Sequence, residues 1–216
     1  MNRFTLVLTF LLSLVSFPSL GIDFGDLIEG NGLYYEKFKD VPYTGRITGG
    51  SLEFQIEGYM SNGMREDEWA EYHKNGQLYK KGNYKNGKKD GEWLWYDDHG
   101  QLSYKGTYEK GIEEGGWVRW HDNGRVSGKG TYKNGTMEGA YNYYHYTGYL
   151  REKGTYKNGI RDGEWFQYHK YGLLKEKGNY KNGIMEGEWV EVFYNQDSTI
   201  DKELTATYKN GIKISQ

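Results

Sequence analysis

Four histidines recur in register along the chain, with a carboxylate in the place of a missing one. Imidazole and carboxylate groups are common zinc ligands, so such a column could bind metal. Positions one repeat apart in a hairpin array lie about 9.5 Å from each other, whereas zinc–ligand bonds are about 2 Å long, so neighbours cannot share an ion. We therefore interpret the column as exposed polar residues before a turn and expect no metal site. Its members are His73, Asp97, His121, His145 and His169.

A glycine-rich motif between Gly82 and Lys88 reads G-x-x-x-x-G-K, one residue short of a phosphate-binding loop. That loop needs Ser or Thr after the lysine to meet magnesium, but the next residue here is Lys89. The same glycine spacing recurs in later units, and no helix is expected to follow it. The motif therefore predicts repeat turns. The other pairs are Gly106/Gly111, Gly130/Gly135, Gly154/Gly159 and Gly178/Gly183.

Other groups that could act chemically follow the repeat too closely to form an active site. No serine sits in a nucleophile elbow, and the absence of cysteine excludes thiol catalysis, disulfides and thiolate metal sites. A column of carboxylates before a glycine column is interpreted as turn residues: Asp90, Glu114, Glu138, Asp162 and Glu186. We predict that the protein is not an enzyme and has no catalytic, cofactor-binding or metal site.

The element that positions all these residues is a 24-residue unit repeated without insertion or deletion. Strict spacing of this kind is typical of stacked repeats. Two aromatic columns, three residues apart, are the candidate binding face. The first is Trp69, Trp93, Trp117, Tyr141, Trp165 and Trp189, and the second is Tyr72, Tyr96, Trp120, Tyr144 and Tyr168.

Asn-Gly pairs predict the turns, because both residues tolerate positive φ in tight hairpins. Turn sites alternate at spacings of 13 and 11 residues within the array, which gives two strands per unit. The fold class is therefore all-β, an elongated single-layer antiparallel meander with an aromatic ladder. Trp93 and Tyr96 lie on opposite faces unless a bulge intervenes. The nine pairs begin at Asn31, Asn62, Asn75, Asn86, Asn123, Asn134, Asn158, Asn182 and Asn210.

Two lysine columns leave two interpretations open. They could gather on one surface and contact anionic lipid or an acidic partner. Alternatively, they pair across strands with glutamates such as Glu92, Glu164 and Glu188, which keeps the sheet soluble. The first column is Lys81, Lys105, Lys129, Lys153 and Lys177, and the second is Lys85, Lys133, Lys157 and Lys181.

The ends of the chain differ from the repeat. Residues 1–21 combine Arg3, an apolar stretch and a small-residue cleavage site, which predicts a secretory signal peptide and a periplasmic or extracellular protein. The apolar stretch is shorter than the roughly 20 residues that span a bilayer, although an uncleaved anchor is the alternative. Removing Arg3 changes the formal net charge from −2 to −3, which disfavours nucleic acid as a partner. We expect an N-terminal cap at 22–44, the array at 45–194 and a capping hairpin with a four-residue insertion at 195–216.

The unit from Gly91 to Gly115 reads G-E-W-x-x-Y-x-x-x-G-x-L-x-x-K-G-x-Y-x-x-G-x-x-x-G and resembles the MORN repeat, closest to its bacterial variant. The resemblance covers about Gly45 to Gly211 and departs from the pattern at Ala140, Tyr141, Thr147 and Val192. It implies an elongated β-meander that serves as an interaction or membrane-association module without catalysis. Some bacterial relatives are called antitoxin components, a role that the leader does not favour.

Three functions follow from these observations. The first is a non-catalytic exported scaffold that contacts an unknown protein partner or a membrane surface. The second is a cell-wall or carbohydrate-binding module, because tryptophan and tyrosine ladders can stack on sugar rings. The third is the antitoxin-like component that the resemblance implies. An array this regular offers little of the asymmetry that an active site needs.

Overall fold

The computed structural model describes residues 21–50 and 54–215, so the predicted leader lies outside the described residues except for Gly21. The N-terminal part comprises β1 (Ile22–Asp23), a short 3-10 helix η1 (Phe24–Asp26), β2 (Leu27–Gly30), β3 (Leu33–Glu36) and β4 (Gly45–Thr48). The array comprises β5 (Phe54–Ser61), β6 (Met64–His73), β7 (Leu78–Lys85), β8 (Lys88–Tyr96), β9 (Leu102–Glu109), β10 (Ile112–Glu113), β11 (Gly115–Trp120), β12 (Val126–Lys133), β13 (Thr136–Met137), β14 (Gly139–Tyr144), β15 (Leu150–Lys157), β16 (Ile160–Arg161), β17 (Gly163–Tyr168), β18 (Leu174–Lys181), β19 (Ile184–Tyr194), β20 (Ile200–Lys209) and β21 (Ile212–Ser215).

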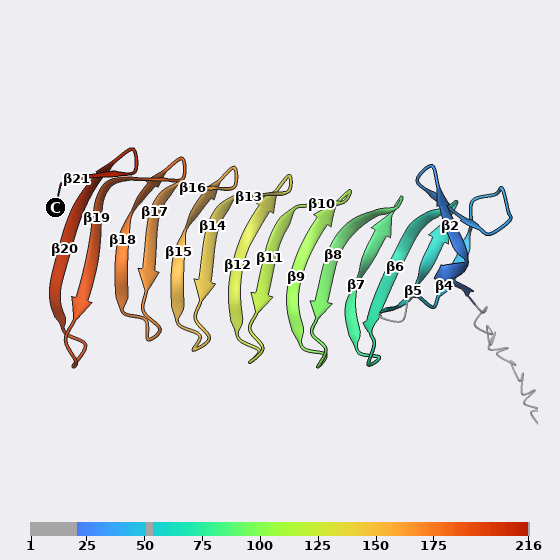
Figure 1. The fold of residues 1–216 in the computed structure, drawn as a ribbon, viewed down its shortest axis with the longest axis horizontal. Coiled ribbons are helices and arrows are strands. Elements are labelled where there is room, and N and C mark those ends of the chain that lie inside the picture. The colour runs from blue at the N-terminus through green and yellow to red at the C-terminus, as the bar shows by residue number, and fades with distance from the viewer. Residues whose placement is uncertain (1–20, 51–53, 216) are drawn as a thin grey trace, which may run out of the picture.

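These strands form one long, open sheet (Figure 1). Neighbouring strands of the array pair antiparallel, as β7 does with β8 and β8 with β9, while the short strands β10, β13 and β16 pair with β9, β12 and β15. At the N-terminal end, β1 pairs in parallel with β4, and β2 and β3 form a separate hairpin. The predicted all-β, single-layer meander is confirmed. Among the described residues, no helix is long and apolar enough to cross a membrane.

Two kinds of turn join the strands and define the two long edges of the sheet. On the short-turn edge, two-residue turns have both residues at positive φ, as at Asn86 (49°) and Gly87 (73°). On the long-turn edge, only the glycine is left-handed, as at Gly76 (84°), and the amide of His73 donates to the carbonyl of Gln77 (2.7 Å). The long turns match a three-residue hairpin loop with a glycine bulge. The expectation that every Asn-Gly pair takes the same conformation is therefore wrong for the long turns.

A two-residue bulge in each unit bends the sheet. Asn83 pairs with Asp90, but its neighbour Gly82 pairs with Trp93, so Gly91 and Glu92 have no partners on β7. Gly91 has φ of 76°, a conformation that glycine adopts without strain. Bulges bend the strand that carries them, and Figure 1 shows every second strand turning over near the short-turn edge. In three units the bend interrupts the strand, which separates β10 from β11, β13 from β14 and β16 from β17.

The bend creates an inner corner in which the aromatic ladder packs. The five tryptophans of the first column are only 0–6% exposed, although the sheet is a single layer. Tyrosines separate them: the ring of Tyr84 lies 5.8 Å from Trp69 and 5.1 Å from Trp93, edge-on to both. Aromatic pairs of this geometry contribute about 0.5–1.5 kcal/mol each beyond their buried area. The predicted aromatic ladder is thus the core of the array.

Glycine opposite each tryptophan makes this packing possible. A Cβ added to Gly82 would lie 2.4 Å from Cδ2 of Trp93, and one added to Gly178 would lie 2.1 Å from Cδ2 of Trp189. The indole rings therefore lie flat on the glycine backbone of the neighbouring strand. This contact explains why a glycine column runs through strands that would otherwise favour larger residues.

The two ends close the ladder differently. At the N-terminal end, Ile47 and Met60 are fully buried, and partly buried residues of the preceding segment pack against them and against Trp69. At the other end, the β19–β20 hairpin stays in register until a shift between Phe193 and Tyr194. The four-residue insertion therefore lengthens this hairpin.

Candidate functional site

The two predicted aromatic columns lie on opposite faces of the sheet. Side chains alternate along β8, so Trp93 and Trp95 share one side, where their ring centres lie 5.9 Å apart, and Tyr96 points to the other side. The lysines that flank the glycine column share the face of the second aromatic column, as the contact of Lys129 Nζ with the Tyr144 ring shows (5.9 Å). We call this side the lysine face and the other the tryptophan face. The columns therefore do not form one candidate binding face.

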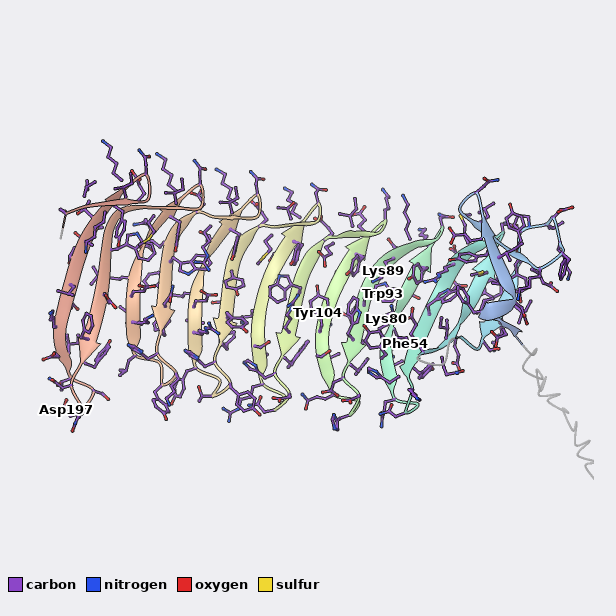
Figure 2. The ribbon with its side chains drawn as sticks, viewed as in Figure 1. Phe54, Lys80, Lys89, Trp93, Tyr104 and Asp197 are labelled. Atoms are coloured by element: carbon purple, nitrogen blue, oxygen red, sulfur yellow. The ribbon has the colours of Figure 1, made fainter. Side chains whose placement is uncertain are left out.

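The tryptophan face is occupied by the protein's own cations. Lys89 Nζ lies 4.5 Å from the ring centre of Trp93, 4.9 Å from that of Trp95 and 4.8 Å from that of Tyr108. Figure 2 shows Lys89 and Trp93 close together near the short-turn edge. Burial, and secondly the nearby charge of Lys80, lowers the pKa of Lys89. Cation–π contacts thus cover the ring faces that a ligand would need.

The same arrangement recurs in two other units. Arg65 lies 4.7 Å from the ring of Trp69, and Arg161 lies 4.2 Å from that of Trp165. Each cation is four residues before its tryptophan, a spacing that the sequence analysis missed. The sequence pattern that could have revealed it is a basic residue four positions before the tryptophan in three units. The first aromatic column is therefore a structural core, and its role in binding stays a prediction.

In the third unit, a carboxylate replaces the cation. Glu113 Oε1 accepts weak hydrogen bonds from the hydroxyls of Tyr104 and Tyr108, both at 3.4 Å. Burial, followed by the charge of Glu113, raises the pKa of Tyr108 to about 12, and the same causes raise the pKa of Tyr104. Both phenols stay protonated at neutral pH, so neither acts as a base there.

The histidine column joins neighbouring units. Nε2 of His73, His121 and His145 lies 2.8–3.1 Å from the carbonyl oxygen of the residue 23 positions later. These three side chains are half-buried rather than exposed, which corrects the sequence interpretation. Imidazole N–H groups that bond to a backbone carbonyl hold the next strand in register. The column thus has a structural role.

The carboxylate column also links units. Glu66 Oε2 accepts from the amide of Asn86 in the next short turn (2.8 Å), and Glu114 Oε2 accepts from that of Asn134 (2.7 Å). Further along the array, Glu138 does the same for Asn158 at 2.7 Å. These residues order the turns, so the carboxylate column has a structural role like that of the histidines.

The short-turn edge carries a row of cations. Its lysines are exposed and project from successive hairpin tips: Lys85, Lys88, Lys110, Lys133, Lys157, Lys181 and Lys209. Among the described residues, the only ion pair in this row joins Lys110 to Glu109 at 3.7 Å. By contrast, Lys105 of the first column is paired with Glu92. Cross-strand pairing with glutamate therefore applies to part of the first lysine column and not to the second.

Isoleucines alternate with these lysines on the short-turn edge. Ile112, Ile160, Ile184 and Ile212 are 47–68% exposed, and each follows its turn glycine directly. The long-turn edge carries acidic residues besides lysines, among them Asp98, Asp122 and Asp197 at the tip labelled in Figure 2. Its exposed apolar residues are mostly aromatic, such as Tyr146, Tyr149 and Tyr171 at 53–65%. The two edges of one sheet thus differ in charge and in the kind of apolar side chain that they expose.

The comparisons with known proteins agree with this architecture. The family model described as MORN repeat variant matches residues 68–86 and 89–110, which cover β6 to β9. The chain is a MORN-repeat protein. No curated protein matches it. The MORN array continues past the matched stretch in the same register to Trp189. MORN repeats form scaffolds for protein or membrane interaction in general, and the family is generally non-catalytic.

Proposed function

We propose that this MORN-repeat protein is a non-catalytic, exported scaffold that docks on an anionic membrane surface through its short-turn edge. The observation that supports the proposal is the row of exposed lysines on that edge, interleaved with exposed isoleucines. Of these lysines, Lys110 alone is in an ion pair within the described part of the chain. A lysine near an anionic leaflet contributes about 1 kcal/mol, and an apolar side chain adds its transfer from water. The seven lysines, carried by six hairpin tips, act together because all belong to one sheet.

The rest of the molecule fits this orientation. With net charge −2 for the full sequence, the protein has no general attraction for anionic surfaces, so contact depends on the edge. The acidic tips of the long-turn edge would then point away from the lipid, which leaves both sheet faces open to other molecules. Export is supported by the leader at 1–21, and detection of the protein in envelope or secreted fractions tests it.

Vesicle sedimentation tests the docking proposal. We expect the purified protein to sediment with phosphatidylcholine vesicles that contain phosphatidylserine, and not with phosphatidylcholine alone. The double substitution Lys157→Glu and Lys181→Glu should reduce binding at least about tenfold. A matched change on the other edge, Lys74→Glu with Lys170→Glu, should leave binding within about twofold. Equal losses in both double variants, or no binding to anionic vesicles, would reject the proposal in favour of a protein or glycan partner.

A further inference from the structure

The lysine face is interrupted at the centre of the array. In the column just before the tryptophans, four units carry glutamate, but the third and fourth carry Gly116 and Ala140. Glu92 pairs with Lys105, thirteen residues later. At the same offset before Lys129 and Lys153, Gly116 and Ala140 replace the glutamate, so these two lysines lack that carboxylate. Within the part of the chain that the structure describes, neither takes part in an ion pair.

A polar residue stands between these two lysines. Lys129 pairs across the ladder with Asn142, and Asn142 pairs with Lys153 on its other side. In the other units of the array that place holds Ala70, Leu94, Val118, Phe166 or Val190. The row Lys129–Asn142–Lys153 therefore presents an amide between two cations on one face of three adjacent strands.

The same place is hollow and has an aromatic wall. Ala140, Asn142, Lys153, Thr155 and Phe166 line an open depression, bounded by Glu164 towards the C-terminal end. Next to it, a Cβ added to Gly116 would meet nothing within 4 Å. Lys153 Nζ lies 4.6 Å from the ring centre of Phe166. Small residues thus open a space that glutamate side chains would occupy in other units.

We propose that this hollow binds an acidic saccharide, with its carboxylate at Lys153 on the side of Lys129 and its hydroxyls at Asn142 and Thr155. The amide of Asn142 can donate to and accept from sugar hydroxyls. A peptide fits less well, because the site lies within the sheet, where the ladder already uses the backbone groups that would pair with an added strand. The site lies on a face, separate from the short-turn edge, and does not depend on membrane docking.

Replacing Ala140 by the residue found in other units tests the site and should leave the fold intact. Ala140→Glu introduces the residue found at Glu92, Glu164 and Glu188, and Ala140→Gln adds the same bulk without charge. Titration calorimetry would use the full protein with a galacturonic acid trisaccharide, the corresponding neutral galactose trisaccharide and a triglutamate peptide. Thermal unfolding of each variant checks that the sheet is intact.

We expect the acidic trisaccharide to bind the unmodified protein, Ala140→Glu to weaken it at least about tenfold, and Ala140→Gln to weaken it less than about threefold. The edge variant Lys157→Glu with Lys181→Glu should bind it as the unmodified protein does. Equal binding of the neutral sugar would overturn the role of the lysines, and equal binding of triglutamate would overturn the choice of saccharide. No loss of binding in Ala140→Glu, or no binding of any probe, would overturn the site itself.

Discussion

The outer and central units of the array use the same sequence pattern but pack it differently. In outer units the indole N–H donates to a carbonyl released by the bulge, as Trp93 Nε1 does to Asn83 (3.0 Å) and Trp189 Nε1 to Asn179 (3.2 Å). In central units, Nε1 of Trp117 and Trp165 is buried and has no partner. The equivalent carbonyl of Thr107 accepts instead from the amide of Glu114 (2.9 Å).

The difference shows that the array tolerates local departures because each unit contacts mainly its neighbours. Trp117 packs against Gly128 and Gly130, on the side where Tyr141 replaces a tryptophan. The third and fourth units, with Gly116 and Ala140, have also lost the glutamates of the lysine face. Regular outer units therefore hold the sheet together, and the irregular centre supplies the asymmetry that a specific site requires.

The largest expected effect concerns the glycine under an outer tryptophan. Gly82→Ala would place a Cβ 2.4 Å from the Trp93 ring, so the ring must move away from the backbone of residue 82. Overpacking of this kind should lower the free energy of unfolding by about 3 kcal/mol in urea denaturation. Gly116→Ala, whose Cβ meets nothing within 4 Å, is the control and should change it by less than about 0.5 kcal/mol. Similar losses in both variants would contradict the packing argument.

The second prediction restores the consensus tryptophan at the centre. Because Trp117 Nε1 would lie 2.9 Å from a Cβ on Gly130, that glycine is already covered. Tyr141→Trp should therefore destabilise the protein by about 1–2 kcal/mol, although it improves the match to the repeat. Tyr144→Trp lies on the lysine face, where Trp120 already occupies the same column. It should change the free energy of unfolding by less than about 0.5 kcal/mol. A gain in thermal stability from Tyr141→Trp would show that the central packing is not fixed by Trp117.

The sequence predicts the repeat, the turn positions and the meander, because fixed spacing and Asn-Gly pairs report directly on strand length. It does not predict the inner corner. The two-residue bulge rests on a left-handed backbone at Gly91, which a glycine column permits but does not require. Asp67 takes the same conformation, with φ of 59°, without being glycine. Without knowledge of the bend, the tryptophans are predicted to lie exposed on one face of the sheet.

The roles of side chains between units were also beyond the sequence. The contact of His73 with the carbonyl of Tyr96 depends on how far adjacent hairpins are staggered, and spacing alone leaves that stagger open. Likewise, both lysine columns were readable, but only the structure distinguishes the paired Lys105 from the unpaired Lys157. The sequence shows that Ala140 and Tyr141 depart from the repeat. Their separate effects, on the lysine face and on the tryptophan packing, appear only in the structure, where the two columns lie on opposite faces.

The third prediction measures the indole hydrogen bond directly. Trp93→Phe removes packing and leaves the Asn83 carbonyl without its donor, whereas Trp117→Phe removes a donor that has no partner. The outer substitution should therefore cost about 1 kcal/mol more than the central one in the free energy of unfolding. Denaturant titration of both variants gives the difference. A larger loss for Trp117→Phe would mean that the central indole makes a bond, for instance to water, that outweighs the outer one.

The smallest expected effect is a loss of stability at alkaline pH, caused by the phenol of Tyr108 next to Glu113. Burial and Glu113 raise the pKa of Tyr108 from 10.0 to about 12, so the folded state holds this proton more tightly than the unfolded state. Its stabilising effect is complete below pH 10 and is lost as the pH rises towards about 12. Glu113→Gln should lower the pKa of Tyr108 and reduce this loss, although burial still raises it. Tyrosinate absorbance in native protein and in urea, with unfolding followed over the same pH range, would measure both shifts. If the tyrosinate signal of Glu113→Gln matched that of the unmodified protein, the carboxylate would have no part in holding the central phenols neutral.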